Sequence, residues 1–296
     1  MDKVVVIGGS GFMGSHTADE LTKRGYAVSI YDRCSSPWLL DQQQMFIGDM
    51  LDRNALIQCC KDARYIFHFG GVADIRESLD QPLETIQTNI MGTTIALEAA
   101  LEVGVERFLY ASTLYVYSPF GSFYRATKQA AEILIEAYHE KFGLNYTLLR
   151  YGSLYGPRAQ EWNGLKQYVT QIVCKGKLEY PGTGRERREY IHVEDAARLT
   201  VDVLNSPNSN HAVTVSGSQA LSSSELIEMI FEIAGVDRNV SYSKAESKNE
   251  HYEMTPYRYT PKTAKKVVPS EFIDIGQGIL DLVAQINQEN DRKASD

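Results

Sequence analysis

The stretch "KVVVIGGSGFMGSH", Lys3–His16, decides the fold. A short run of β-branched residues stops at glycines and leads directly into a segment with helical character. Gly8 permits a tight turn, Gly11 lets the backbone approach a pyrophosphate, and Gly14 lets the helix pack on the strand. The helix that follows presents free N–H groups to phosphates. The pattern predicts a strand–turn–helix unit that binds a dinucleotide.

Acidic residues end the next two expected strands. Asp32 lies 18 residues after Gly14, where a carboxylate accepts hydrogen bonds from a ribose diol and repels a 2′-phosphate. This position favours NAD over NADP, although Arg33 beside it could accommodate that phosphate. Asp49, followed by Met50, ends the third strand at a point that lies near the adenine in such folds. Asp49 could instead cap the following helix, or serve both purposes.

Strands and helices alternate through the first half of the chain. A helical stretch follows Pro82, and another runs from Tyr124 to Phe142. Such alternation predicts an α/β fold, a Rossmann-type doubly wound parallel sheet covered on both faces. The expected strands are residues 3–9, 26–32, 45–49, 64–71, 106–112 and 145–152.

The pattern loosens after about Tyr155, which predicts a smaller, split C-terminal substrate lobe. Helices are expected at residues 164–175, 192–204, 223–234 and 276–288, and a strand at residues 211–217. We expect residues 1–155, with residues 186–216 returning to them, to form an NAD-binding Rossmann domain. Residues 156–185 and 217–296 would form the substrate-binding lobe.

The composition is that of an ordinary globular protein. The chain has 296 residues, of which 43% are apolar and 23% charged. Its net charge of -8 and the lack of a long basic run argue against nucleic acid, and no apolar run is long enough for a membrane span. The four cysteines have no metal-ligand spacing, so we expect no metal site and free thiols in the cytoplasm.

The motif "YRATK" carries an acid/base pair. Tyr124 and Lys128 are four residues apart and share one face of a helix. A phenol ordinarily loses its proton near pH 10, but a neighbouring ammonium and a cationic nicotinamide would lower that pKa, so the tyrosine could act as a base. Thr113, at the end of the preceding strand, offers a hydroxyl to the same substrate oxygen, while Ser112 would point the other way. This order of groups indicates hydride-transfer chemistry.

With these motifs in order, the chain resembles the extended short-chain dehydrogenases/reductases of the NAD-dependent nucleotide-sugar epimerase/dehydratase family. The resemblance implies a Rossmann lobe that holds NAD, a smaller lobe that grips a nucleoside-diphosphate sugar, and a homodimer built on the helices at residues 82–103 and 124–142. The matching segments are "GGSGFMG", "YD", "GDM", "HFGG", "TNIMGT", "ASTLYVY", "YRATK", "LRYGSLYGPR" and "GTGRERREYIHVEDAA".

The resemblance also assigns roles by position. Thr113 would steady the sugar oxygen, Tyr124 would be the acid/base, and Lys128 would orient the ribose. Arg188 resembles the family arginine near the sugar-nucleotide phosphates, and Arg258 is a candidate for a second one. Together with the positions argued above, the expected cofactor contacts are Gly8, Gly11, Phe12, Met13, Gly14, Asp32, Arg33, Asp49, Met50, Phe69, Gly70, Gly71, Ser112, Tyr124, Lys128, Tyr151 and Ser153.

Departures from the family pattern narrow the activity. Family dehydratases place an Asp-Glu pair directly after the Ser/Thr, and decarboxylases a glutamate at the second of these positions. This chain has Leu114 and Tyr115 there, so both reactions are disfavoured. We therefore expect epimerisation at C4 through a transient 4-keto sugar. A nucleotide-sugar 4-oxidoreductase needs the same groups and stays an alternative, as does a non-catalytic NAD-binding regulator.

The remaining polar residues in these motifs are expected to be structural. His16, His68 and His192 would pack and form hydrogen bonds, and Asp195 would cap the helix that follows it. Asn89 would support the active-site helix through backbone hydrogen bonds.

Overall fold

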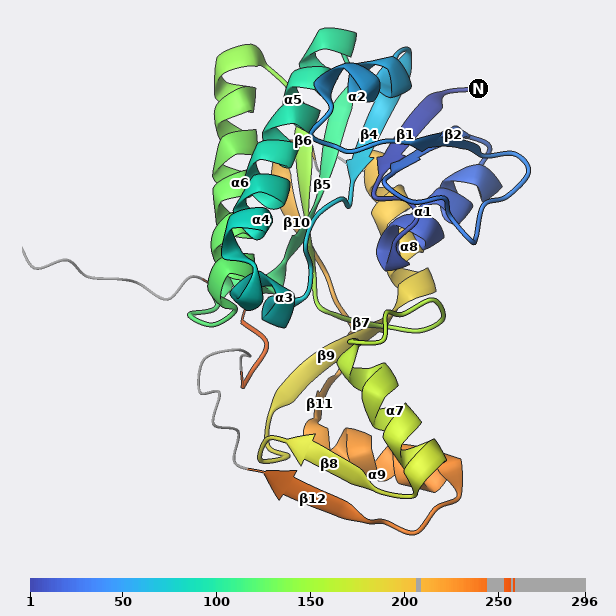
Figure 1. The fold of residues 1–296 in the computed structure, drawn as a ribbon, viewed down its shortest axis with the longest axis vertical. Helices are drawn as coiled ribbons and strands as arrows, with labels where there is room; N and C mark the ends of the chain where they lie inside the picture. Colours follow the sequence, from blue (N-terminus) through green and yellow to red (C-terminus); the bar gives the residue numbers. More distant parts are fainter. Residues whose placement is uncertain (206–208, 244–252, 257, 259–296) are drawn as a thin grey trace, which may run out of the picture. The chain divides into compact units, whose positions relative to one another are not determined.

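A seven-stranded parallel sheet organises the N-terminal part of the chain (Figure 1). The computed structural model describes residues 1–205, 209–243, 253–256 and 258. The strand order is β10-β6-β5-β4-β1-β2-β3. The chain adds β2 and β3 on one side of β1 and then continues with β4 on its other side, which is the change of order found in a doubly wound sheet. This confirms the predicted Rossmann-type sheet. The strands are β1 (Lys3–Ile7), β2 (Ala27–Asp32), β3 (Gln44–Ile47), β4 (Ala63–His68), β5 (Arg107–Thr113), β6 (Tyr146–Tyr151) and β10 (His211–Val215).

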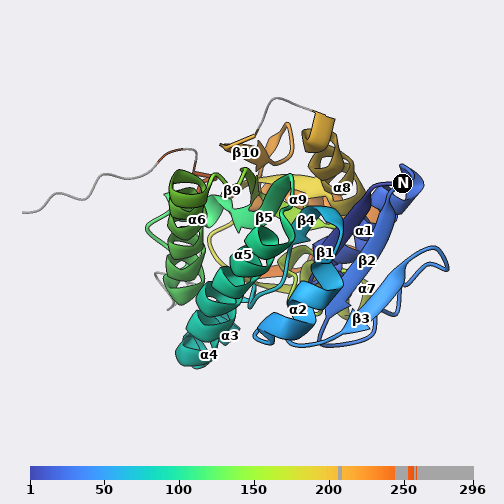
Figure 2. The same cartoon turned by 90° about the horizontal axis from the view of Figure 1, so that it is seen from above.

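Helices cover both faces of this sheet (Figure 2). One face packs against α1 (Phe12–Lys23) and α8 (Val193–Asp202). The other packs against α2 (Arg53–Cys60), α5 (Gly92–Val103) and α6 (Ser122–Phe142). Because successive strand residues point to opposite faces, the apolar run of β1 serves both cores, with Val4 and Val6 in one and Val5 and Ile7 in the other.

The helical stretch after Pro82 contains an irregular turn. It consists of α4 (Pro82–Ile86), a π-helical turn η1 (Gln87–Met91) and α5, and a short helix α3 (Ile75–Asp80) that was not predicted comes before it. Asn89 lies in the π turn and is buried. Its Nδ2 donates to the Val72 carbonyl and to Thr127 Oγ1 of α6, each at 3.0 Å, and its Oδ1 accepts from the Val72 N–H at 2.7 Å. These bonds tie α6 to the chain that leaves β4.

Two predicted caps differ from the structure. Asp52, rather than Asp49, caps α2, because its side chain accepts from the Ala55 N–H, whereas Asp49 accepts from the Leu51 N–H in the preceding turn. The cap of α8 is His192, whose ring accepts from the Glu194 N–H, and the prediction for Asp195 was wrong. Asp195 already belongs to the first turn, where it pairs with Arg198.

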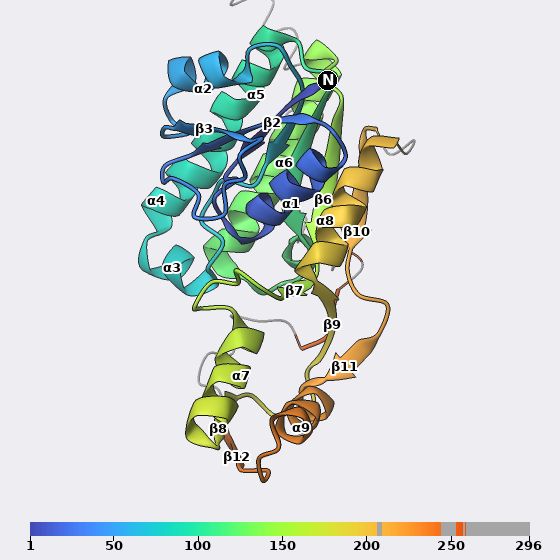
Figure 3. The same cartoon turned by 90° about the vertical axis from the view of Figure 1, so that its right-hand side faces the viewer.

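Two helices and five short strands make up the described C-terminal region (Figure 3). A three-stranded sheet in the order β11-β9-β7 and a parallel pair β12-β8 accompany the two helices, whose predicted bounds are confirmed. Ile172, Leu178, Ile227 and Phe231 form part of its buried core. The elements are β7 (Ser153–Tyr155), α7 (Gly164–Lys175), β8 (Leu178–Pro181), β9 (Arg187–His192), β11 (Ala220–Ser222), α9 (Ser223–Ala234) and β12 (Val240–Ser243).

The segment expected to return to the Rossmann domain divides at α8. Helix α8 packs on the large sheet and strand β10 pairs within it, whereas β9 pairs with β7 and β11. The part of this segment that packs with the large sheet begins at Val193. The helix expected at residues 276–288 lies outside the described residues. In the described part of the chain, no helix has the length and apolarity needed to cross a membrane.

Candidate active site

The glycine turn between β1 and α1 leaves no room for a side chain at Gly8 or at Gly14. Gly8 has a φ of +77°, and a Cβ there would lie 2.5 Å from the Gly70 nitrogen. A Cβ on Gly14 would lie 2.2 Å from the Gly8 carbonyl oxygen, so this glycine lets the helix start directly against the turn. Gly11 is the N-cap of α1, and no side chain caps the helix. The first-turn N–H groups are thus left for a ligand, as an anion site at a helix N-terminus requires.

Asp32 at the end of β2 is held next to this turn. Its carboxylate accepts from the Ser10 N–H at 3.0 Å and from the Cys34 N–H at 3.3 Å. Ser10 Oγ in turn donates to the Cys34 carbonyl at 2.8 Å, so the segment after β2 is fixed to the glycine turn. The backbone thereby orients the predicted ribose-binding carboxylate before any ligand arrives.

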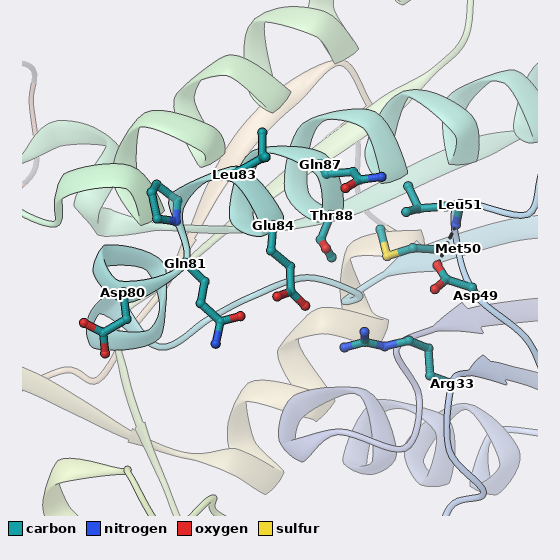
Figure 4. A pocket seen from close by; sticks show the side chains of 11 residues that line it. Arg33, Asp49, Met50, Leu51, Asp80, Gln81, Leu83, Glu84, Gln87 and Thr88 are labelled. Atoms are coloured by element: carbon teal, nitrogen blue, oxygen red, sulfur yellow. Dashed lines mark hydrogen bonds between the residues drawn. The ribbon is translucent and has the colours of Figure 1, made fainter.

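A cavity of about 600 Å³ opens beside Asp49 and Met50 (Figure 4). The buried Tyr31 donates its hydroxyl to the Asp49 carbonyl at 2.8 Å, which fixes this corner. Arg33 points into the same space, so three predicted cofactor residues meet there. The far wall was not predicted as part of the site, and it runs from the end of α3 through α4 into η1. Its residues are Asp80, Gln81, Pro82, Leu83, Glu84, Gln87 and Thr88, with Leu51 beside Met50.

The predicted acid/base group lies where β5 ends and α6 begins. Thr113, the last residue of β5, accepts the Tyr115 N–H on its Oγ1 at 3.2 Å. Lys128 is buried, and its ammonium donates to the Ala111 carbonyl of β5 at 2.7 Å. Tyr124 is half-buried, one turn before Lys128 on α6. The lysine thus joins the tyrosine's helix to the strand that ends at Thr113.

The electrostatic surroundings of Lys128 are unusual for a lysine. Burial lowers the pKa of its ammonium to about 8, while the charge of Glu132 acts in the opposite direction. The ammonium lies 4.7 Å from the centroid of the Tyr110 ring, a favourable cation–π arrangement. With this pKa the lysine is still mainly an ammonium near pH 7, and a pKa lowered in this way is common for groups at functional sites.

His68 is a structural residue, in keeping with expectation. Its Nε2 lies 3.0 Å from Thr93 Oγ1, and the Thr93 hydroxyl donates to the Asn89 carbonyl at 2.7 Å. The threonine oxygen therefore accepts from His68, which fixes the neutral Nε2–H tautomer. Burial, and secondly the charge of Lys128, lower the pKa of His68 to about 3.

The other predicted cofactor positions lie along the same edge of the sheet. Phe12 and Met13 are buried in the first turn of α1, and Phe69, Gly70 and Gly71 directly follow β4. Two hydroxyls have partners of their own, since Ser112 donates to Glu132 at 2.5 Å and Tyr151 lies 2.6 Å from the Thr200 hydroxyl. Ser153 is half-buried at the start of β7.

Tyr115 stands where family dehydratases carry an acid. Its ring packs edge-on against the Tyr124 ring, with 6.0 Å between centroids. Gly121, with a φ of +96°, makes this possible, because a Cβ there would lie 2.7 Å from the Tyr115 ring. The short connection before Tyr124 therefore seats an aromatic ring, not a carboxylate, beside the acid/base residue.

One of the predicted phosphate-binding arginines, Arg188, lies in the three-stranded sheet. Arg188 is half-buried on β9, opposite Leu221 of β11. Burial raises the pKa of Tyr168, and the positive charge of Arg188 opposes this rise, which places the two groups near each other. Residues 253–255 run beside β9, through bonds between Arg187 and the backbone of Glu253 and Thr255. This brings the chain leading to the exposed Arg258 back to the strand that carries Arg188. Among the described residues, no group of three His, Cys, Asp or Glu side chains could hold a metal ion.

Comparisons with known proteins agree with this geometry. Residues 4–216 match the model of the NAD dependent epimerase/dehydratase family. A UDP-N-acetyl-alpha-D-glucosaminuronate decarboxylase of Bacillus cytotoxicus is 26% identical, over 89% of this chain and 90% of the relative. A UDP-glucuronate 4-epimerase of Thermodesulfobacterium geofontis is also 26% identical, over 79% of this chain and 81% of the relative. The solved structure of MoeE5 with UDP-glucose and NAD is 27% identical and superposes with a TM-score of 0.77, over 86% of this chain and 88% of that one.

The glycine turn, the oriented carboxylate after β2 and the Thr–Tyr–Lys group lie inside the matched residues. The cofactor expected from Asp32, NAD, is the one that the family uses. The chain belongs to the NAD-dependent epimerase/dehydratase family of enzymes.

Proposed function

We propose that this protein is an NAD-dependent nucleotide-sugar epimerase that inverts C4 through a transient 4-keto sugar. One observation supports the proposal: Lys128 bonds to the strand that ends at Thr113, Tyr124 lies one turn earlier on the same helix, and Leu114 and Tyr115 follow Thr113. The site has an acid/base group for a hydroxyl, but no carboxylate at these positions to remove a proton from carbon.

The residues around the glycine turn fit NAD. Gly8 and Gly14 allow no Cβ, so the backbone of this turn can lie against a pyrophosphate. Asp32 would bind the adenine ribose, and the cavity beside Asp49 and Met50 would receive the adenine. When bound, NAD supplies reversible oxidation of the sugar carbon.

The protein's own side chains then manage the proton of the sugar hydroxyl. Tyr124 accepts this proton on its phenolate oxygen and returns it when the ketone is reduced. The Lys128 ammonium stabilises the phenolate, and its bond to the Ala111 carbonyl fixes its position. The bond from the Tyr115 N–H uses Thr113 Oγ1 as an acceptor, so the threonine proton is free to steady the sugar oxygen.

The dehydratase and decarboxylase reactions and a purely regulatory role fit this site less well. Leu114 carries no acidic group and Tyr115 carries a phenol that packs on Tyr124, so these positions lack the carboxylates of a dehydratase or a decarboxylase. A regulator would have no use for a buried lysine one turn after a tyrosine, because a buried ammonium costs stability. Net 4-oxidoreduction uses the same groups but must release the reduced cofactor after each turnover.

We assign the sugar nucleotide to the C-terminal lobe. Residues 156–192 and 217–296 would grip it, with Arg188 and Arg258 near its phosphates, while residues 1–155 and 193–216 hold NAD. The proximity of Arg188 to Tyr168 supports this assignment, because it brings a positive charge and a hydroxyl together in this lobe.

We further propose a homodimer in the cytoplasm. Large apolar side chains are exposed on neighbouring helices: Leu83 on α4 is 76% exposed, Met91 on η1 52% and Ile133 on α6 65%. A second copy packing these helices into a four-helix bundle would cover them. The four cysteines are free thiols, which suits a reducing compartment.

Proton NMR of the protein with NAD and UDP-, GDP-, dTDP- and CDP-sugars tests the function. A new anomeric signal with no net NADH absorbance would establish epimerisation and identify the substrate. Stoichiometric NADH together with a keto-sugar signal would overturn the proposal in favour of the oxidoreductase. Gel filtration with light scattering, comparing Ile133→Glu with wild type, tests the dimer, since the variant should run as a monomer.

A further inference from the structure

A buried ion pair lies one helical turn beyond the acid/base group. Arg150 of β6 donates to Glu132 of α6 through two bonds, Nη2 to Oε2 at 2.6 Å and Nε to Oε1 at 3.0 Å. The two side chains are only 10% and 3% exposed. The bidentate geometry makes the attraction between the two charges strong. The cost of removing both charges from water offsets most of that attraction, so the pair adds little net stability.

Two further side chains connect the pair to the active site. Ser112 donates its hydroxyl to Glu132 Oε1 at 2.5 Å. Arg150 donates to the Tyr117 hydroxyl, and its guanidinium carbon lies 4.7 Å from the centroid of that ring. Ser112 comes directly before Thr113, and Tyr117 ends the turn directly after it. The network therefore holds the chain on both sides of Thr113.

The same carboxylate faces Lys128. Tyr124, Lys128 and Glu132 follow one another at intervals of four residues on α6, so they lie on one face of the helix. From other elements, Tyr110 and the Ala111 carbonyl of β5 and His68 of β4 also face the Lys128 ammonium, and on α6 Tyr124 lies one turn before it, close to Tyr110. His68 is neutral, because its pKa is lowered to about 3. Glu132 is thus the carboxylate that acts on the lysine within α6.

We propose that Glu132 is a positioning residue that keeps Lys128 protonated at neutral pH, and that Arg150, Ser112 and Tyr117 hold its carboxylate in place for this purpose. The inference rests on the proposed function, in which the ammonium must carry its charge to stabilise the Tyr124 phenolate. Burial alone pushes Lys128 towards its neutral form, and the negative charge of Glu132 opposes this. An ion pair that adds little stability would then be retained for its effect on the lysine.

The test follows the Lys128 pKa directly, without substrate or turnover. Protein labelled with ¹³C at the lysine Cε is titrated by NMR, and the Lys128 signal is assigned by its loss in Lys128→Arg. In Glu132→Gln the midpoint should fall by about one pH unit. The matched control is Glu136→Gln, which removes an exposed carboxylate one turn further along α6 and should leave the midpoint unchanged.

Glu132→Gln leaves Arg150 buried without its charged partner and could unfold the protein. The double variant Glu132→Gln/Arg150→Met removes both charges and should melt near wild type. Its Lys128 midpoint should fall in the same direction, by roughly half a unit. An unchanged midpoint in this folded double variant, or an equal fall in Glu136→Gln, would overturn the inference. The titration needs no turnover, so its outcome does not depend on the proposed function. A wild-type protein without epimerase activity would refute that function, and the effect of Glu132 on the Lys128 pKa would still be measured.

Discussion

Replacing Gly14 with alanine should damage the cofactor site by steric overlap alone. A Cβ at this position would lie 2.2 Å from the Gly8 carbonyl oxygen and 2.9 Å from the Gly9 Cα. Both contacts are with backbone, so no side chain can rotate away. Restoring ordinary contact distances would push the turn and the helix apart by about 1 Å. Overpacking of this kind costs about 1–3 kcal/mol, against a helix-propensity gain of up to about 1 kcal/mol for replacing glycine.

We expect Gly14→Ala to lose about 1–2 kcal/mol of folding stability. Its affinity for NAD should fall at least roughly tenfold, because each 1.4 kcal/mol lost from binding is a factor of ten. Thermal unfolding followed by circular dichroism measures the first effect and calorimetric titration with NAD the second. Gly164→Ala is the matched control: this glycine also opens a helix, α7, and a Cβ there would come no closer than 3.5 Å, to the Tyr168 hydroxyl. Wild-type NAD affinity in Gly14→Ala would refute the steric reasoning.

Three further changes have defined outcomes. Lys128→Met should raise stability at pH 7 by about 2 kcal/mol and abolish turnover. The Lys128 pKa is about 8 in the folded wild type, against 10.5 for an ordinary lysine, so the stability of the wild type should rise from pH 8 to 10.5. Urea titrations over this pH range should show no such rise in the variant. His68 is neutral in the fold, so the wild type should lose up to about 1.4 kcal/mol of stability per pH unit as the pH falls from 6.5 towards 3. His68→Gln should lack this acid-induced loss. Asp32→Ala should weaken NAD binding by roughly tenfold and reduce the preference of the protein for NAD over NADP. Titration with each cofactor measures both effects. An unchanged preference for NAD would mean that Asp32 does not select the cofactor.

Much of the Rossmann sheet follows from local sequence, because each strand ends at a chemically distinct signal. The β-branched run of β1 stops at Gly8, and β2 ends at Asp32, which the adjoining backbone then holds. The short strands β7, β8, β9, β11 and β12 could not be predicted in the same way. They have three to six residues each and pair across long separations, as when β9 pairs with β7 and β11, so their signals are tertiary.

The site residues that could be predicted are those with reactive side chains at helical spacing. Contacts between distant parts of the chain, and the exact caps, could not be predicted. Tyr124 and Lys128 share a helix face by spacing alone, and the bond from Lys128 to the Ala111 carbonyl then joins them to β5. The Glu132–Arg150 pair carries no local signal, because its members lie on an inner helix face and an inner strand that meet only in the fold. The caps at Asp52 and His192 were misplaced by three residues, a shift that depends on where each turn closes.

The central claim is that Tyr124 moves the proton during inversion at C4. The most direct test compares wild type with Tyr124→Phe by anomeric-proton NMR on the nucleotide sugar that wild type converts, with bound NAD quantified in both proteins. We predict that Tyr124→Phe keeps its NAD and its fold and loses turnover by a factor of about 10² to 10⁴, while wild type epimerises with no net NADH. Turnover by Tyr124→Phe at the wild-type rate would contradict the account.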